Sequence, residues 1–262
     1  MALTHPSEFS GLTAVITGAA RGIGRSIAES LHARGARLIL IDCRADIGND
    51  TVAALRTRGG APVDLLVADL ARPDSIAGLA LEIADMTPAI DLLVNNAGIE
   101  LDLPWDRLTA GEFDRVLAVN LRAPFLLTQA LAGQFPPAGG AILNLSSIHA
   151  THAFLNSIAY ACSKAGLLAL TRNLALELAP RRIRVNALCP GYIDTPLWEE
   201  WVNSAPDPEA LSRETTALHP LGRRGQPDDV ASAALYLLSP SSSFITGTSL
   251  VIDGGLTIRA HP

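Results

Sequence analysis

Two side chains that could exchange a proton lie four residues apart in this chain, Tyr160 and Lys164. That spacing places them on one face of a helix. A free tyrosine has a pKa near 10, too high for a base at neutral pH, but a cation about 4 Å away lowers it by roughly three units. We therefore expect Lys164 to lower the pKa of Tyr160 and make it a usable acid or base. The alternative is an exposed tyrosine and lysine on an amphipathic helix.

A second group of residues predicts a phosphate-binding turn. The segment TGAARGIG at 17–24 follows an apolar run and begins a helical pattern. Glycines let backbone N–H groups approach a pyrophosphate, and a helix N-terminus favours anions. The spacing G-x-x-x-G-x-G differs from the usual G-x-G-x-x-G, so a simple tight turn is the alternative. Asp42 lies 18 residues beyond Gly24, where an acidic residue can bind ribose hydroxyls and repel a 2′-phosphate.

The scaffold for these residues is an alternation of apolar runs and amphipathic stretches. Runs that are apolar throughout indicate parallel strands covered on both faces, and right-handed crossovers then produce a doubly wound sheet. No linker divides the chain, so we predict a single α/β domain over residues 1–262 with about seven strands. The predicted strands are 12–17, 37–42, 63–68, 90–94, 140–146, 183–188 and 249–252, and the predicted helices are 22–35, 45–58, 73–85, 111–135, 157–179 and 226–238.

One segment, 193–225, breaks this alternation and contains several prolines. Segments of this length usually cover a site, so we predict a substrate-covering insertion. Polar and aromatic side chains here and after the predicted strands suit a hydroxylated substrate. The alternatives are solvent exposure for the polar ones and packing of the cover for the tryptophans. The candidates are Glu100, His149, His152, Asn156, Trp198 and Trp201.

Composition excludes several classes of protein. Of the 262 residues 48% are hydrophobic, which excludes global disorder. The net charge is −6 without a basic block, so nucleic acid and anionic membranes are poor partners. The scattered Cys43, Cys162 and Cys189 indicate neither a metal site nor a disulfide framework, and they fit the cytoplasm. We see no signal-peptide pattern in the first eleven residues and no apolar run of the ~18 residues that span a bilayer.

Taken together, the motifs resemble those of a classical short-chain dehydrogenase/reductase. The resemblance covers nearly all of the chain from Gly11 to Gly255, with the motifs in the family's order. It implies a hydride transfer between NAD(P) and a secondary alcohol or its ketone. The motifs are TGAARGIG at 17–24, Asp69, NNAG at 95–98, Asn120, Ser147, YACSK at 160–164, PG at 190–191 and DGG at 253–255.

The resemblance also implies a role for each residue. Tyr160 would be the general acid/base, and Lys164 would hold the nicotinamide ribose and lower the pKa of Tyr160. Ser147 would hydrogen-bond the reacting oxygen, and Asn120 would hold a water that links Lys164 to solvent. The cofactor-binding residues would be Gly18, Arg21, Gly22, Ile23, Gly24, Asp42, Asp69, Leu70, Asn96, Gly98, Tyr160, Lys164, Pro190, Gly191, Ile193 and Thr195.

Several choices stay open at this level. Asp42 favours NAD, whereas Arg21 and Arg44 leave NADP possible. The favoured substrate is a sugar, polyol or sugar-acid, and the alternatives are a 3-oxoacyl thioester with NADPH, or a steroid or aryl diol. A non-catalytic dinucleotide sensor is least expected, because Tyr160 and Lys164 are both present. The family also implies a homotetramer in which the helices at 111–135 and 157–179 pair across a two-fold axis.

Overall fold

In the computed structural model, which describes residues 7–259, seven strands form one parallel sheet. The strand order is β3-β2-β1-β4-β5-β6-β7. Successive strands are added outward from β1 to one edge up to β3, and from β4 onward to the other edge, so the order switches between β1 and β4. This confirms the predicted doubly wound α/β fold. The strands are β1 (Thr13–Thr17), β2 (Arg37–Asp42), β3 (Val63–Val67), β4 (Leu92–Asn95), β5 (Gly140–Leu145), β6 (Ile183–Pro190) and β7 (Ser249–Ile252).

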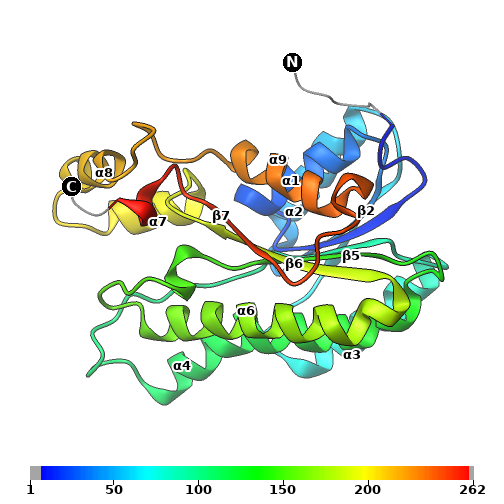
Figure 1. Cartoon of the computed structure of the whole chain (residues 1–262), viewed down its shortest axis with the longest axis horizontal. Helices are drawn as coiled ribbons and strands as arrows, with labels where there is room; N and C mark the ends of the chain where they lie inside the picture. The colour runs from blue at the N-terminus through cyan, green and yellow to red at the C-terminus, as the bar shows by residue number, and fades with distance from the viewer. Residues whose placement is uncertain (1–6, 260–262) are drawn as a thin grey trace.

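Helices cover both faces of the sheet (Figure 1). One face carries α1 (Gly22–His32), α2 (Ala45–Thr57) and α9 (Pro227–Leu238). The other carries α3 (Pro73–Met86), α4 (Ala110–Leu117), α5 (Ala123–Leu131) and α6 (Ile158–Leu178). Two further helices, α7 (Pro196–Asn203) and α8 (Pro208–Ala217), lie together at one end of the molecule.

The central strands are apolar on both faces because each face packs on a separate layer of helices. In β1, Ala14 and Ile16 belong to the core beneath α1 and α9, whereas Val15 belongs to the core beneath α3 and α5. All five residues of this strand are buried. This packing explains why the strands read as continuous apolar runs rather than alternating ones.

The single helix predicted at 111–135 needs correction. A π-helical turn, Ala118–Arg122, separates α4 from α5 and holds the buried Asn120. Residues 110–134 also form a run long and apolar enough to cross a membrane by length and composition, contrary to our expectation. Half of the 18-residue window that meets this criterion is buried. Of the two helices in this run, α4 packs on α6 and α5 packs on α3, as in a core helix.

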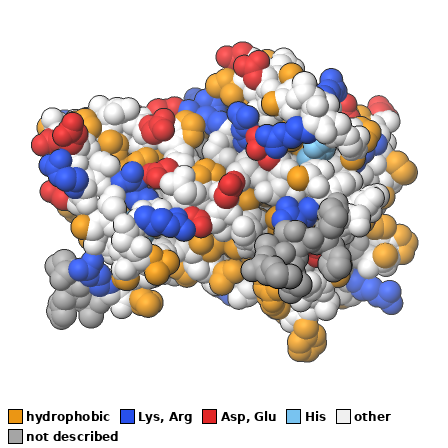
Figure 2. Space-filling model, turned by 90° about the horizontal axis from the view of Figure 1, so that it is seen from above, with side chains coloured by type: hydrophobic (Ala, Val, Ile, Leu, Met, Phe, Trp, Pro, Cys, Tyr) orange, Lys and Arg blue, Asp and Glu red, His pale blue; other side chains and the backbone are white. Residues whose placement is uncertain are grey.

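Element boundaries differ from the prediction by a few residues. The fourth strand begins at Leu92 rather than Ile90, whose N–H group instead donates to the carbonyl of Gln134. The sixth strand continues to Pro190 because it pairs with β7 to that point. Residues 1–6, which belong to the segment where we expect no signal peptide, lie outside the described residues. On the face seen in Figure 2, basic and acidic side chains are interspersed.

Candidate active site

A cavity of about 710 Å³ lies at the carboxyl ends of the strands, beside α7. Such an edge is where doubly wound sheets bind ligands. Gly24, Asn120, His152 and Asn156 are the predicted site residues that do not line it. The predicted residues that do are Gly18, Arg21, Gly22, Ile23, Asp42, Asp69, Leu70, Asn96, Gly98, Glu100, Ser147, His149, Tyr160, Lys164, Pro190, Gly191, Ile193, Thr195, Trp198 and Trp201.

The glycine-rich turn after β1 forms one wall of this cavity. Gly18 and Gly22 have φ of 63° and 57°, a conformation that favours glycine. A Cβ on Gly24 would collide with the carbonyl of Gly18 and the amide of Asn96. The first turn of α1 has no side-chain cap. Its backbone N–H groups therefore fit an anionic ligand such as a pyrophosphate.

Asp42 is fixed at the same end of the cavity. Its side chain is nearly buried, and its two carboxylate oxygens accept hydrogen bonds from the N–H groups of Ala20 at 3.0 Å and Arg44 at 3.1 Å. The Arg44 guanidinium lies 3.8 Å from it. This holds a carboxylate where a ribose would present its hydroxyls, so the residues of this end fit a dinucleotide.

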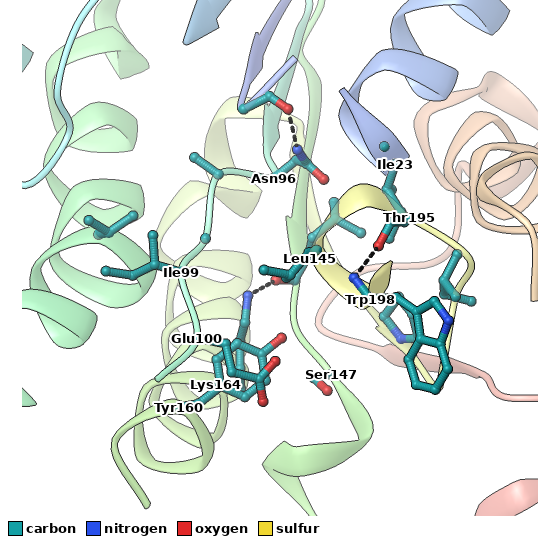
Figure 3. Close-up of a pocket in the computed structure, with 18 of the residues that line it drawn as sticks. Ile23, Asn96, Ile99, Glu100, Leu145, Ser147, Tyr160, Lys164, Thr195 and Trp198 are labelled. Carbon is teal, nitrogen blue, oxygen red and sulfur yellow. Dashed lines mark hydrogen bonds between the residues drawn. The ribbon is translucent and has the colours of Figure 1, made fainter. Parts of the chain in front are cut away.

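Tyr160 and Lys164 lie together on α6 at the other end of the cavity, with Ser147 opposite them after β5 (Figure 3). Lys164 Nζ donates to the carbonyl oxygen of Leu145 at 2.6 Å and lies 5.4 Å from the centre of the Tyr160 ring. The Ser147 hydroxyl is near enough to the Tyr160 phenol to lower its pKa. A hydroxyl or carbonyl oxygen placed between them would meet two groups able to donate or accept a proton.

Our expectation that Lys164 lowers the pKa of Tyr160 was wrong for the protein without ligand. Burial raises the pKa of Tyr160, the charge of Glu100 raises it further, and the hydrogen bond with Ser147 only partly opposes them. Burial also lowers the pKa of Lys164 to about 8. Desolvation therefore outweighs the attraction that the helical spacing predicts, because both groups sit inside the cavity rather than at an exposed helix face.

Asn120 stands behind the cavity and makes three hydrogen bonds. Its Oδ1 accepts from the N–H of Ile99 at 2.9 Å, and its Nδ2 donates to the carbonyl of Ile99 at 2.9 Å and to Ser163 Oγ at 3.0 Å. These bonds tie the loop after β4 to α6. Both amide protons are used, so the remaining lone pair of Oδ1 is what could accept from a relay water.

Glu100 and His149 face each other beside Tyr160. Glu100 Oε1 lies 3.7 Å from His149 Nδ1, and the His149 ring stands edge-on to the Tyr160 ring with centroids 5.2 Å apart. Burial, then the charge of Asp102, raises the pKa of Glu100 to about 7. Burial, then the charge of Lys164, lowers the pKa of His149 to about 4. The imidazole is therefore neutral at physiological pH.

Two of the proposed substrate-facing residues point elsewhere. Asn156 is exposed and has φ of 62°, so it forms the left-handed position of a turn and does not line the cavity. His152 is exposed and bonds Thr151 Oγ1 at 3.0 Å. The structure does not bring either side chain into the site.

The segment 193–225 covers the cavity only with its first part, the residues just before α7 and α7 itself. Thr195 caps α7 by accepting from the N–H of Trp198, and the Trp198 ring packs under the Arg224 guanidinium at 4.8 Å. Arg21 of the glycine turn pairs with Glu200 of α7. Residues of α8 are absent from the lining. Trp198 thus both lines the cavity and anchors its cover.

Sequence reasoning missed four residues at this end. Asp102 and Ser157 line the cavity, and Ser157 Oγ donates to Asp102 at 3.1 Å and to Glu100 at 3.4 Å. Phe154 stacks on His149 at 3.9 Å, and Tyr192 stacks on Trp201 at 6.0 Å. Asp102 was detectable as a second acid near Glu100. The aromatic contacts join separate loops and leave no local signal.

Comparisons with known proteins agree on one family. The model described as Enoyl-(Acyl carrier protein) reductase matches residues 18–257. A 3beta-hydroxysteroid dehydrogenase of Eggerthella lenta is 38% identical over 255 residues, covering 96% of this chain and 95% of its own. A D-threitol dehydrogenase of Mycolicibacterium smegmatis is 37% identical over 254 residues, covering 96% and 95%.

A solved structure from Beutenbergia cavernae is similar throughout. It is a proposed NAD(P)-dependent gluconate 5-dehydrogenase with NADP bound at low occupancy. Its TM-score is 0.89 at 34% identity, and the match covers 97% of this chain and all of that one. This chain and that structure therefore share one fold over nearly the whole of this chain.

Proposed function

This chain belongs to the short-chain dehydrogenase/reductase family of NAD(P)-dependent oxidoreductases that act on CH–OH groups, and we propose that it oxidises a secondary alcohol of a sugar or polyol with NAD. One observation carries the proposal. Tyr160, Lys164 and Ser147 lie at one end of a single cavity whose other end is the glycine turn and Asp42. A dinucleotide along this cavity would bring its nicotinamide to the proton-transfer group.

In the proposed reaction Tyr160, as the phenolate, would accept the proton of the substrate hydroxyl, and bound NAD would supply the acceptor for the hydride of the alcohol carbon. Ser147 hydrogen-bonds the same oxygen and keeps it against the phenol. Lys164, held by the Leu145 carbonyl, would hold the nicotinamide ribose. Because burial raises the pKa of Tyr160, its deprotonation depends on positive charge. The bound oxidised cofactor supplies such a charge together with the hydride acceptor.

The proposed preference for NAD rests on Asp42. Its carboxylate is nearly buried and held by two backbone N–H groups, so it cannot turn away from a ligand without losing both. A ribose hydroxyl can donate to it, whereas a 2′-phosphate would meet a fixed negative charge. Arg44 is the residue that would soften this repulsion.

The proposed substrate class rests on polar side chains beyond the reacting oxygen. Glu100, His149 and Ser157 can each hydrogen-bond a second hydroxyl of the substrate, and a simple aliphatic alcohol has no second hydroxyl. A 3-oxoacyl thioester with NADPH is the second candidate, supported by a 3-oxoacyl-[acyl-carrier-protein] reductase of Thermotoga maritima that is 38% identical over 255 residues. Asp42 is evidence against this candidate, because its carboxylate would repel the 2′-phosphate of NADPH.

We further propose that the protein is a cytoplasmic homotetramer with a small-molecule substrate. Support for assembly comes from apolar side chains exposed on the predicted pairing helices, among them Phe125 on α5 and Leu176 on α6, with 40% and 78% exposure. Exposed apolar side chains of this kind mark subunit contacts. Light scattering at micromolar concentration tests the assembly, and a monomer would contradict it.

The reaction is tested by following reduced nicotinamide in the purified protein with NAD or NADP and a panel of sugars, polyols and simple secondary alcohols. We expect reduction of NAD with a polyol or sugar. Reduction of an acetoacetyl thioester by NADPH, with no alcohol oxidised, would replace the proposal by the second candidate. No turnover with any of these, despite dinucleotide binding, would favour a sensor.

A further inference from the structure

Beyond the catalytic residues, one polar contact in the cavity is incomplete. His149 Nδ1 is buried without a hydrogen-bond partner, and it faces Glu100 Oε1 at 3.7 Å, too far for a hydrogen bond. The His149 side chain is 12% exposed and that of Glu100 24%. A buried nitrogen without a partner costs free energy, so its protonation state should be the one that attracts the nearest charge.

The position of Glu100 decides which nitrogen of His149 carries the proton. With a hydrogen on Nδ1, the ring attracts the carboxylate; with a lone pair there, two acceptors would face each other. Phe154 stacks on the ring at 3.9 Å and prevents it from turning out of its plane. The proton therefore belongs on Nδ1, and Nε2 carries a lone pair.

That lone pair is available to a ligand. Among residues 7–259, Nε2 makes no hydrogen bond and does not belong to the buried unpartnered atoms, and His149 lines the cavity next to Tyr160. An acceptor here matches an O–H group of a substrate whose reacting oxygen lies between Tyr160 and Ser147. An ether or carbonyl oxygen at the same place would meet a second lone pair.

The same residues repel anions. Glu100 and Asp102 lie on either side of the Ser157 hydroxyl, whose single proton they share at 3.4 Å and 3.1 Å. A substrate carboxylate in this part of the cavity would meet two carboxyl groups and find Nε2 without a proton to donate. Lys164 is the nearest cation, and it donates to the Leu145 carbonyl.

We propose that Glu100 and His149 form a second substrate subsite, in which Glu100 keeps His149 Nε2 as an acceptor for a neutral hydroxyl group next to the reacting carbon and excludes carboxylates. The inference rests on the proposed function and narrows its substrate class to neutral sugars and polyols, which excludes the sugar-acids. His149 contacts the substrate, and Glu100 acts through His149 as a positioning residue.

The charges around the pair support this assignment at alkaline pH. The pKa of His149 is lowered to about 4, so the ring is neutral, and the pKa of Glu100 is raised to about 7. Asp102, Lys164, Tyr160 and Tyr192 are the other titratable groups coupled to Glu100. The test therefore belongs at about pH 8.5, where Glu100 is ionised.

The test compares three alcohols that share one reacting carbon: 2,3-butanediol, 3-methoxy-2-butanol and 2-butanol. The neighbouring group can donate a hydrogen bond in the first, only accept one in the second, and is missing in the third. We expect kcat/KM with NAD to be at least about tenfold higher for the diol than for the ether. Sorbitol should likewise exceed gluconate, the acid of the same chain length, by at least about tenfold.

Variants assign the effect to the pair. His149→Ala should bring the diol-to-ether ratio close to one. Glu100→Gln should also lower it, because an amide can donate to Nδ1 and move the ring proton to Nε2, while gluconate gains on sorbitol. His152→Ala, an exposed histidine three residues away from His149, is the matched control and should leave both ratios unchanged. NAD binding and circular dichroism confirm that each variant is folded.

The outcomes separate this inference from the proposed function. Equal kcat/KM for the diol and the ether in the wild type, or ratios untouched by both variants, would overturn the subsite while secondary-alcohol oxidation stands. A preference for gluconate over sorbitol would overturn it as well. If no alcohol of the set reduces NAD or NADP, the proposed function and the subsite both fall.

Discussion

The two ends of the cavity differ in how their polar groups are satisfied. At the glycine turn, Asp42 accepts from two backbone N–H groups, and Asn96 donates to the carbonyls of Thr17 and Gly18 at 3.0 Å and 2.9 Å. At the opposite end, His149 Nδ1 has no hydrogen-bond partner, and the nearby Glu100 Oε1, at 3.7 Å, is too far from it for a hydrogen bond. The polar side chains of the first end are paired within the protein, and those of the second end are not.

This difference indicates a division of work. An end whose groups already bond one another offers a rigid surface of defined shape, which suits a ligand common to a whole family. An end with unpaired buried groups gains most from a ligand that pairs them, and it penalises one that does not. Changes at the first end should thus alter cofactor binding and stability, and changes at the second should alter substrate choice.

The largest effect is expected at Tyr160, in the end of the cavity opposite the glycine turn. Tyr160→Phe keeps the ring and removes the group that exchanges the proton, so turnover should fall by a factor of about 10² to 10⁴. NAD affinity, measured by fluorescence titration, should stay within a few-fold of the wild type. A variant that kept a tenth of wild-type turnover would remove Tyr160 from the role of acid/base.

The next largest effect concerns the rigidity of the glycine turn. In Gly24→Ala the new Cβ would collide with the carbonyl of Gly18 in the turn and with the side-chain amide of Asn96 in the loop after β4, which are hydrogen-bonded to each other. We expect loss of NAD binding and a destabilisation of about 1–3 kcal/mol by urea unfolding. Gly111→Ala, in α4 with no atom within 4 Å of the added Cβ, is the control and should be neutral or slightly stabilising. Similar results for both variants would contradict a tightly packed turn.

Cofactor preference should respond to Asp42 with an intermediate effect. Asp42→Ala removes a charged hydrogen-bond acceptor and the repulsion of a 2′-phosphate, so the NAD/NADP ratio of kcat/KM should fall by a factor of about 10 to 100. Asp50→Ala removes the same charge from an exposed position on α2 and serves as the control. A ratio that both variants leave unchanged would mean that Asp42 does not read the ribose.

The smallest expected effect tests the substrate end without any substrate. Because the pKa of Glu100 in the folded protein is raised from 4.5 to about 7, the folded state favours the protonated form, and stability is lost as pH rises through this range. Glu100→Gln cannot ionise, so it should exceed the wild type in stability by about 1 kcal/mol at pH 8 and match it at about pH 4.

Thermal unfolding at both pH values checks this, with Glu82→Gln, on the exposed side of α3, as the control. Equal stability of Glu100→Gln and wild type at pH 8 would show that Glu100 ionises without penalty. The inference that buried polar groups at the substrate end are left without adequate partners would then lose support.

The contrast also explains what the sequence could predict. The glycine turn, Asp42 and the Tyr160–Lys164 spacing are local patterns, and parallel strands bring their carboxyl ends to one edge, so the cofactor end and the fold followed from them. The π-helical turn at Asn120 could not be predicted in this way, because it follows from contacts of Asn120 with Ile99 and Ser163, which are 21 and 43 residues away in the sequence.

Side-chain direction in the loops was harder still. Glu100 and His149 reach the cavity, whereas Asn156, with its positive φ, turns to solvent. A left-handed residue is not evident from composition, and the aromatic contacts among Phe154, Tyr192 and Trp201 join three separate segments. The pKa of Tyr160 was mispredicted for a related reason, because helical spacing says nothing about desolvation.

If the protein oxidises a secondary alcohol with NAD, the hydride of the alcohol carbon must be found in the reduced cofactor, and isotope transfer shows whether it is. The purified protein is incubated with NAD and a neutral alditol deuterated at its secondary carbons, and the reduced cofactor is analysed by mass spectrometry. We expect one deuterium in the nicotinamide ring of each reduced molecule. Reduced cofactor without deuterium, or no reduced cofactor from an alditol at all, would contradict it.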